Sequence, residues 1–180
     1  MDHFQPWLVA TLASAKTVAA IMRSRWGWPI CETVHFLGLS MLIGAIGIFD
    51  LRLLGVARRI PIAALHRVIP WGISGYVINI LSGSMFLMTE PEQYIYNPSF
   101  HFKILFMGLA GLNVLVFYSA VFRRVRTLGP GDDAPVAAKL IGGFSLFLWI
   151  GIIVFGRMLT FYRPFRCSGQ PMVFPFYCLP

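Results

Sequence analysis

The chain has 180 residues, of which 57% are hydrophobic and 12% are charged, and its mean hydropathy is +0.72. A soluble domain of this size needs a polar surface, which this composition cannot supply, whereas a helical bundle in lipid needs none. The net charge of +8 comes from basic residues at the ends of apolar runs. Topology and anionic lipid headgroups account for these residues, so we expect membrane lipid as a partner and no nucleic acid.

The first segment, residues 4–23, is helix-prone but only mildly apolar. Its apolar residues recur at helical spacing, and polar residues such as Lys16 and Thr17 interrupt the rest. This pattern predicts a helix that lies in the membrane interface, and a weak fifth span is the alternative. The apolar positions are Trp7, Leu8, Leu12, Ala15, Ala19 and Met22.

Four longer apolar segments follow. Trp26 and Trp28 suit an aromatic belt at the first of them, and Pro29 suits its first helical turn. The segments run over residues 29–54, 63–88, 99–122 and 137–162. Each exceeds the roughly 20 residues that a crossing helix needs. The predicted fold is therefore all-α: an integral membrane four-helix bundle with an N-terminal interfacial helix, forming one domain over residues 1–180.

Basic residues predict the orientation of the bundle. The links around residues 52–67 and 123–139 lie on the same side and hold eight basic residues, whereas the link TEPEQYIYNPSF has two glutamates and no basic residue. Short basic links stay in the cytoplasm. We therefore expect a multi-pass protein of the bacterial inner membrane, with a tail at 163–180 on the outer side. In that tail Cys167 and Cys178 would be either joined in a disulfide or free.

Ionisable residues inside spans are costly, so they are the first candidates for function. His35 and His101 lie at similar depth in the outer parts of two spans, where they could hold the iron of one b-type haem as axial ligands. Lys103 and Arg157 could pair with the haem propionates. Gly38, one turn after His35, could let a flat ring approach the backbone. The predicted cofactor is therefore haem b, with His35 and His101 as metal ligands.

Other interpretations of the charged residues stay open. Arg157 could pair with Glu32 instead of a propionate. Asp50 could pair with Arg52 or Arg58 at the end of the first span, as part of the architecture, and His66 could be an interfacial cation. Methionines beside Cys167 and Cys178 would suit Cu(I). These methionines are Met85, Met88, Met107, Met158 and Met172.

Three segments of the chain carry motifs. The first, WPICETVHFLGLSMLIGAIGIFDLRLLG, contains W-P-x-x-E-x-x-H-x-x-G followed by D-L-R-L-L-G, and the later ones are YNPSFHFKILFMGLAGLN and FLWIGIIVFGRMLTFY. Together they resemble a family of uncharacterised small bacterial membrane proteins. The resemblance covers most of residues 26–162 and implies no known activity. By the motif, the matching positions are Glu32, His35, Gly38, Asp50 and Arg52. The layout is also similar to membrane b-type cytochromes at the level of the fold.

These observations lead to one leading hypothesis and two rivals. The leading hypothesis is a small membrane subunit that binds haem b and passes electrons between a quinone pool and a periplasmic partner. The first rival is a non-catalytic scaffold or anchor subunit of a larger complex, and the second is a copper-handling protein. Protein subunits or further copies of the chain are the expected partners.

Overall fold

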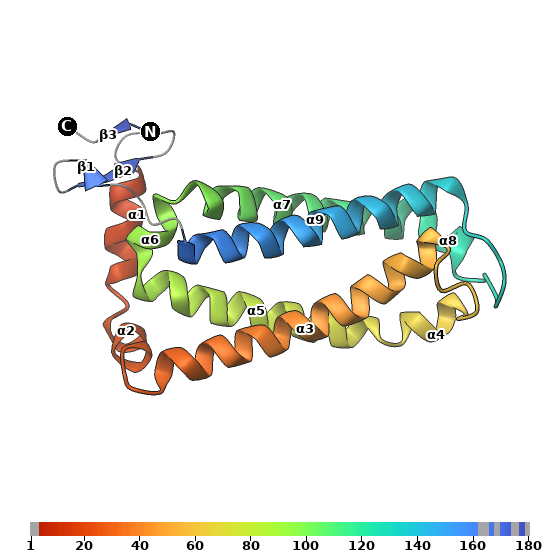
Figure 1. Ribbon diagram of the computed structural model, residues 1–180, viewed down its shortest axis with the longest axis horizontal. Helices are drawn as coiled ribbons and strands as arrows, with labels where there is room; N and C mark the ends of the chain where they lie inside the picture. Colours follow the sequence, from red (N-terminus) through yellow and green to blue (C-terminus); the bar gives the residue numbers. More distant parts are fainter. Residues whose placement is uncertain (1–3, 162–165, 168–169, 174–176, 179–180) are drawn as a thin grey trace.

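The computed structural model describes the backbone of residues 4–161, 166–167, 170–173 and 177–178, and side chains from residue 6 to residue 161. The helices in chain order are α1 (Phe4–Ala13), α2 (Lys16–Met22), α3 (Gly27–Leu54), α4 (Ile62–His66), α5 (Ile69–Thr89), α6 (Pro91–Ile95), α7 (Pro98–Val116), the π-helix η1 (Phe117–Val121), α8 (Phe122–Val125) and α9 (Val136–Phe161). Figure 1 shows a long bundle made of two helical hairpins, α3 with α5 and α7 with α9.

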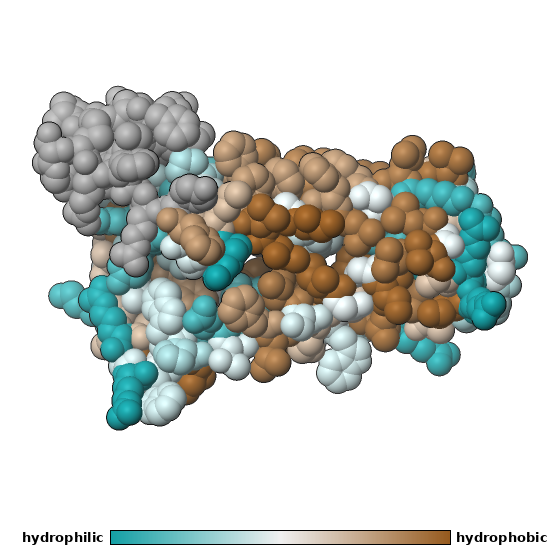
Figure 2. All heavy atoms as spheres, viewed as in Figure 1, coloured by the Kyte–Doolittle hydropathy of each residue, from teal (hydrophilic) through white to brown (hydrophobic). Residues whose placement is uncertain are grey.

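The predicted four-helix membrane bundle is confirmed. Four helical stretches are long and apolar enough to cross a membrane. They are Gly27–Leu54, Ile62–Thr89, Pro98–Val125 and Val136–Phe161, so they match the predicted spans to within a few residues. Hydrophobic side chains cover the middle of the bundle, and hydrophilic ones gather at its two ends (Figure 2). This banding is what a multi-pass protein presents to lipid.

The N-terminal segment forms two short helices instead of one. α1 ends at Ala13, where the Ser14 hydroxyl donates to the Thr11 carbonyl at 2.6 Å. Figure 1 shows α1 lying across the end of the bundle rather than along it, and this segment is not among the helices long enough to span. Met22 of α2 is buried against Cys31 and Phe86. The packing of α2 onto α3 and α5 therefore fixes the interfacial segment to the bundle.

The tail contains three short strands that the sequence did not predict. β1 (Arg166–Cys167), β2 (Gln170–Val173) and β3 (Tyr177–Cys178) pair antiparallel in the order β1-β2-β3. They lie at the same end of the bundle as α1 (Figure 1), which we call the tail end. The predicted alternatives for Cys167 and Cys178 concern side chains outside the described residues.

Glycines bring α3 and α5 into direct backbone contact. A Cβ added to Gly75 would meet the Gly38 carbonyl oxygen, and it would lie 2.8 Å from the Leu42 nitrogen. A Cβ added to Gly38 would lie 2.7 Å from the Asn79 amide nitrogen. Small residues allow such close approach between helices in lipid, where packing replaces the hydrophobic effect as the attraction. The first hairpin is therefore held by a glycine contact near the middle of its length.

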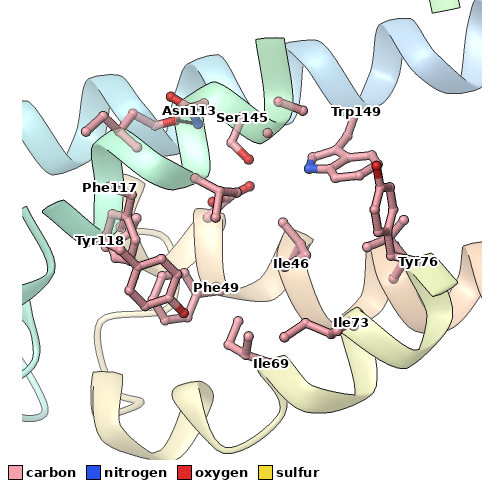
Figure 3. A pocket seen from close by; sticks show the side chains of 18 of the residues that line it. Ile46, Phe49, Ile69, Ile73, Tyr76, Asn113, Phe117, Tyr118, Ser145 and Trp149 are labelled. Atoms are coloured by element: carbon pink, nitrogen blue, oxygen red, sulfur yellow. Dashed lines mark hydrogen bonds between the residues drawn. The ribbon is translucent and has the colours of Figure 1, made fainter. Parts of the chain in front are cut away.

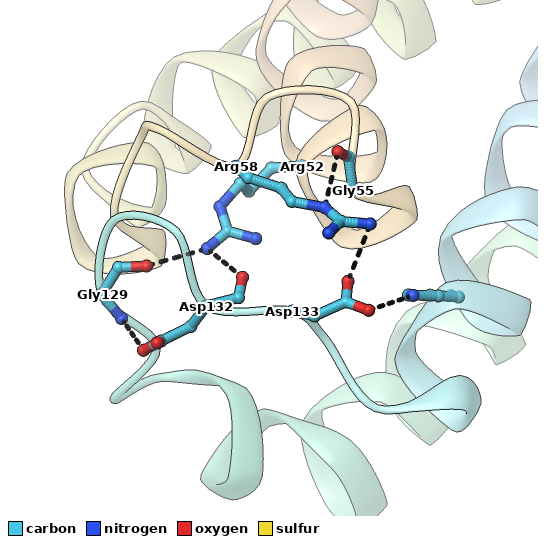
Figure 4. A network of polar contacts seen from close by, with 7 residues as sticks. Arg52, Gly55, Arg58, Gly129, Asp132 and Asp133 are labelled. Carbon is cyan, nitrogen blue, oxygen red and sulfur yellow. Dashed lines mark hydrogen bonds and ion pairs between the residues drawn. The ribbon is translucent and has the colours of Figure 1, made fainter.

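A buried arginine joins the loops at the opposite end, which we call the basic end. Arg52 is fully buried, and its guanidinium donates to the carbonyl oxygens of Ile60 at 2.6 Å, Gly129 at 3.0 Å and Asp132 at 3.1 Å. Figure 4 shows it at the centre of the two loops that follow α3 and α8. Arg52 therefore connects the two hairpins where the chain leaves the bundle.

An exposed ion-pair network flanks this buried arginine. Asp133 contacts Arg58 at 3.5 Å and Lys139 at 2.6 Å. The hydrogen bond from Lys139, with the nearby charge of Arg58, holds the pKa of Asp133 below its usual range. Because the network is exposed to water, we expect it to add little to stability compared with the buried contacts of Arg52.

Candidate functional site

A cavity of about 270 Å³ lies between α3, α5, α7 and α9 in the half of the bundle nearer the basic end. Each of the four long helices contributes side chains to its wall. Figure 3 shows them converging from both hairpins on a common space. The lining residues are Leu42, Ile46, Phe49, Asp50, Leu53, Ile69, Gly72, Ile73, Tyr76, Met107, Ala110, Gly111, Asn113, Val114, Phe117, Tyr118, Ile141, Ser145 and Trp149.

Aromatic rings stand at both ends of this cavity. At one end Phe49 and Phe117 meet edge to face with ring centroids 5.5 Å apart, beside Tyr118. At the other end Tyr76 and Trp149 meet edge to face at 6.3 Å, and the indole nitrogen of Trp149 points toward the cavity (Figure 3). Aromatic and aliphatic walls with a few polar groups are typical of a site for a small organic molecule.

Asp50 is the acidic residue in the cavity wall, and it is only 5% exposed. Its side chain interacts with Ser145 of α9, but its Oδ2 atom has no hydrogen-bond partner among the described residues. A carboxyl group buried within a membrane span is costly unless it is paired. Asp50 is therefore the strongest functional candidate that the structure offers, and the sequence did not single it out as a binding residue.

The predicted pairing of Asp50 with Arg52 or Arg58 is wrong. The guanidinium of Arg52 binds the loop carbonyls, and Arg58 pairs with Asp133. Asp50 and Arg52 are two positions apart, which corresponds to about 200° of rotation around an α-helix, so they lie on nearly opposite faces of α3. Asp50 faces the cavity, and Arg52 faces the loops.

A local change of helix geometry shapes the cavity wall. The five residues of η1, Phe117–Val121, form a π-helix that interrupts the regular winding after α7. Its first two residues, Phe117 and Tyr118, both line the cavity, and the Tyr118 hydroxyl contacts the His66 ring nitrogen Nε2 at 3.2 Å. Single π-turns inside α-helices occur frequently at functional sites. This one supports the cavity as the site.

The cavity reaches the lipid-facing surface between α5 and α7. These two helices hardly touch, whereas α5 packs closely on α3 and α7 on α9. Three lining residues on this side are themselves exposed: Ile73 at 57%, Val114 at 40% and Tyr118 at 41%. Gly111, also exposed, leaves open space where a side chain would stand. A molecule dissolved in the bilayer can therefore enter from the side.

His35, the first predicted haem ligand, lies in the other half of the bundle. Its Nδ1 atom is 2.8 Å from the Ser82 hydroxyl. That hydroxyl donates to the Ile78 carbonyl at 2.6 Å, so in neutral His35 the Nδ1–H must be the donor and Nε2 must carry the lone pair. Metal-bound histidines usually have this arrangement. Lys103, predicted to bind a propionate, acts electrostatically on the same ring.

His101, the second predicted ligand, lies on another side of α7. The inward face of α7 carries Ser99, Lys103 and Ala110, at helical spacing. His101 is two residues from both Ser99 and Lys103, which places it about 200° around the helix from them. Its Nδ1 contacts the Asn97 carbonyl at 3.0 Å, one turn back in the chain. The structure therefore places Lys103 within electrostatic range of His35, whereas His101 lies on another side of α7.

The role predicted for Gly38 is wrong. The sequence suggested that its missing side chain leaves room for a flat ring. The space beside its backbone is filled by Ile78 and Asn79 of α5, each 2.7 Å from the position of an added Cβ. Gly38 thus serves close packing between α3 and α5.

Arg157 and Glu32 are both exposed. The Arg157 guanidinium lies 5.0 Å from the ring centroid of Phe161, one turn further along α9. No ion pair joins it to Glu32 within residues 6–161, so the alternative pairing of the two is wrong for this structure. Over the same residues, no group of three or more His, Cys, Asp or Glu side chains gathers as a metal site. Haem and copper remain predictions.

The comparisons with known proteins assign no family to this chain. No family model, no curated protein and no solved structure matches it. The cavity, its acid and its opening toward lipid are therefore the basis on which a function can be argued.

Proposed function

We propose that this membrane protein binds a lipid-soluble small molecule in the cavity between α3, α5, α7 and α9. The observation that carries the proposal is a laterally open, aromatic-lined cavity in the membrane-spanning part, with one buried carboxyl oxygen that lacks a hydrogen-bond partner. A bilayer-dissolved ligand can enter between α5 and α7 without crossing water. Its polar group would complete the hydrogen bonding of Asp50.

The charge of the wall limits the class of ligand. The described residues that line the cavity include Asp50 but no Lys, Arg or His. An anionic headgroup would meet a carboxyl and no countercharge, so fatty acids and phospholipid phosphates do not suit the cavity. Neutral molecules with a ring and an apolar chain do suit it. A quinone, the partner expected from the sequence, belongs to this class.

Filling the cavity mouth should abolish ligand binding. Gly111 lines the cavity, and a Cβ added there meets no atom within 4 Å, so Gly111→Leu places its side chain in the opening without a clash. We expect the ligand that purifies with the protein from its native membrane to fall by at least about tenfold, since each tenfold corresponds to only about 1.4 kcal/mol. Mass spectrometry of the extracted small molecules measures this loss.

Gly108→Leu is the matched control. Gly108 lies one turn earlier on α7 and also leaves open space, but it does not line the cavity. Its leucine should point into lipid and leave the amount of bound ligand unchanged. If all three proteins carry the same amount of every small molecule, or none at all, the cavity is not a binding site. A scaffold or anchor subunit would then be the better account.

Haem b remains a second proposal, narrowed to His35 as a single protein ligand. It is favoured by the hydrogen bonds that leave the lone pair on Nε2 and by Lys103, which can meet a propionate. A haem bound there would supply the one-electron chemistry that the predicted electron transfer requires. We expect a haem band in the reduced-minus-oxidised spectrum of the purified protein and its loss in His35→Ala. A porphyrin-free preparation from the native host would end this proposal.

The direction of insertion is also a proposal. The two links that hold the eight basic residues, around residues 52–67 and 123–139, lie at one end of the bundle (Figure 1), and we propose that this end faces the cytoplasm of a bacterial cell, with the tail end outside. The cavity would then open to the inner leaflet, and His35 would lie nearer the outer one.

A further inference from the structure

We propose that the ligand of the cavity is held by a hydroxyl group that donates a hydrogen bond to Asp50, which points to a ring-bearing alcohol of the hydroquinone class. This inference rests on the proposed function and specifies its ligand. Asp50 lines the cavity, and only 5% of its surface is exposed. Its Oδ2 atom has no hydrogen-bond partner in the described part of the chain. The chain thus presents an acceptor that a ligand must satisfy.

The neighbouring polar groups leave this acceptor to the ligand. The Asn113 amide is used between helices, where its Nδ2 donates to the Ile141 carbonyl of α9 at 3.2 Å. Ser145 interacts with the Asp50 side chain, yet Oδ2 stays without a partner. An ionised carboxyl group only accepts hydrogen bonds, whereas a protonated one also has an O–H donor. A ligand that only accepts, such as an ether or an ester, would therefore leave this oxygen unpaired when Asp50 is ionised.

The rings around the acid indicate a ring in the ligand. Phe49 and Phe117 stand at one end of the cavity and Tyr76 and Trp149 at the other, with about 270 Å³ between them. Aromatic pairs gain by edge-to-face and offset contacts beyond their buried area. Since entry is from lipid between α5 and α7, the ligand also carries an apolar chain. A hydroquinone with an alkyl or isoprenoid tail combines the ring, the donor and the tail.

Two matched probes test the hydroxyl. The first is a decyl-substituted hydroquinone and the second is its bis-O-methyl ether, which keeps the ring and tail but loses both donors. With the protein in lipid nanodiscs, we expect the hydroquinone to bind at least about tenfold more tightly than the ether, as expected for one hydrogen bond to a buried carboxyl group. Equal affinities for the two probes would overturn the inference.

Variants of Asp50 complete the cycle. In Asp50→Leu the preference for the hydroquinone should disappear, because the acceptor is gone while the apolar wall is kept. Asp50→Asn, which retains an acceptor oxygen and nearly the same shape, should keep part of the preference and serves if the leucine variant does not fold. A preference that survives in Asp50→Leu would also overturn the inference.

Outcomes for this inference and for the proposed function are distinguishable. If a molecule purifies with the protein and is lost in Gly111→Leu, but neither probe binds, the cavity is a site and its ligand is not a hydroquinone. If decylammonium binds more tightly than the decyl hydroquinone, the carboxyl group serves a cation instead. If the probes bind equally well to the wild type and Gly111→Leu, their binding is outside the cavity and both proposals fail.

Discussion

Replacing Arg52 with leucine should leave the protein unable to hold its two hairpins together at the basic end. The substitution removes three hydrogen bonds and leaves the carbonyl groups of Ile60, Gly129 and Asp132 without their donor. A polar group left unpaired in a buried site costs about 1–3 kcal/mol, and part of that cost is recovered because these loops lie near water. We expect a loss of about 3 kcal/mol in the free energy of unfolding.

Thermal unfolding in detergent, followed by the loss of monodisperse protein, measures this effect. Arg59→Leu is the control, because Arg59 is an exposed arginine of the same loop region, and its replacement should change the unfolding temperature little. Arg52→Lys should fall between the two, since a single ammonium group cannot reproduce a planar fork of donors. Equal unfolding temperatures for the Arg52→Leu and Arg59→Leu variants would show that the buried guanidinium does not join the loops.

Gly75→Leu should disrupt the first hairpin. The first atom of the new side chain would collide with the Gly38 carbonyl oxygen and stand 3.0 Å from the Met41 Cβ, so α3 and α5 would have to separate along their closest contact. Overfilling a packed interior costs about 1–3 kcal/mol and occasionally more. Because a rigid backbone is the neighbour, we expect the upper end of that range or a failure to accumulate in the membrane.

The Gly108→Leu variant serves as control for this prediction as well. Its glycine also lies within a long helix, but nothing stands within 4 Å of an added Cβ. There the substitution should be neutral or stabilising by up to about 1 kcal/mol, because glycine is a poor helix former. The comparison is made on the amount of folded protein and its unfolding temperature. If both leucine variants behaved alike, the close contact between Gly38 and Gly75 would not be what holds α3 to α5.

Sequence reasoning succeeded for the long helices because their cause is local. A span needs only length and apolar composition, and both are written along the chain. The same reasoning predicted a single interfacial helix and made no prediction of strands in the tail. The break after Ala13 depends on local hydrogen bonds of Thr11 and Ser14, and the strands depend on pairing within the tail. Neither leaves a simple periodic signal.

The site was harder to predict because it depends on which face each residue presents. Asp50 and Arg52 look like a natural pair in the sequence, yet their spacing directs them to different faces of α3. His101 and Lys103 share a similar depth, but the same spacing separates them around α7. Two of the three carbonyl partners of Arg52 lie in one loop, 77 and 80 residues further along the chain. Helical rotation could have raised these doubts, but the cavity itself appears only when four helices are assembled.

The haem hypothesis also contains one part that the sequence could predict and another that needed the assembled helices. Depth along the helix axis could be estimated from the sequence, and it drew attention to His35 and Lys103, which lie near enough in the structure for the lysine charge to act on the histidine ring. The role of Gly38 could not be estimated in this way, because it is decided by the position of α5. The π-helix at Phe117–Val121 likewise has no signature that sequence periodicity reveals.

Photolabelling in the native membrane is the measurement that tests the central claim most directly. A tail-bearing phenyl diazirine, irradiated in membranes and mapped by peptide mass spectrometry, reports which side chains a lipid-soluble ring reaches. We expect saturable labelling of the cavity residues Met107 and Tyr118, lost in Gly111→Leu and retained in Gly108→Leu. Labelling confined to outward residues of the same helix, such as Leu112 and Leu115, and not reduced by excess unlabelled probe, would contradict a ligand-binding cavity.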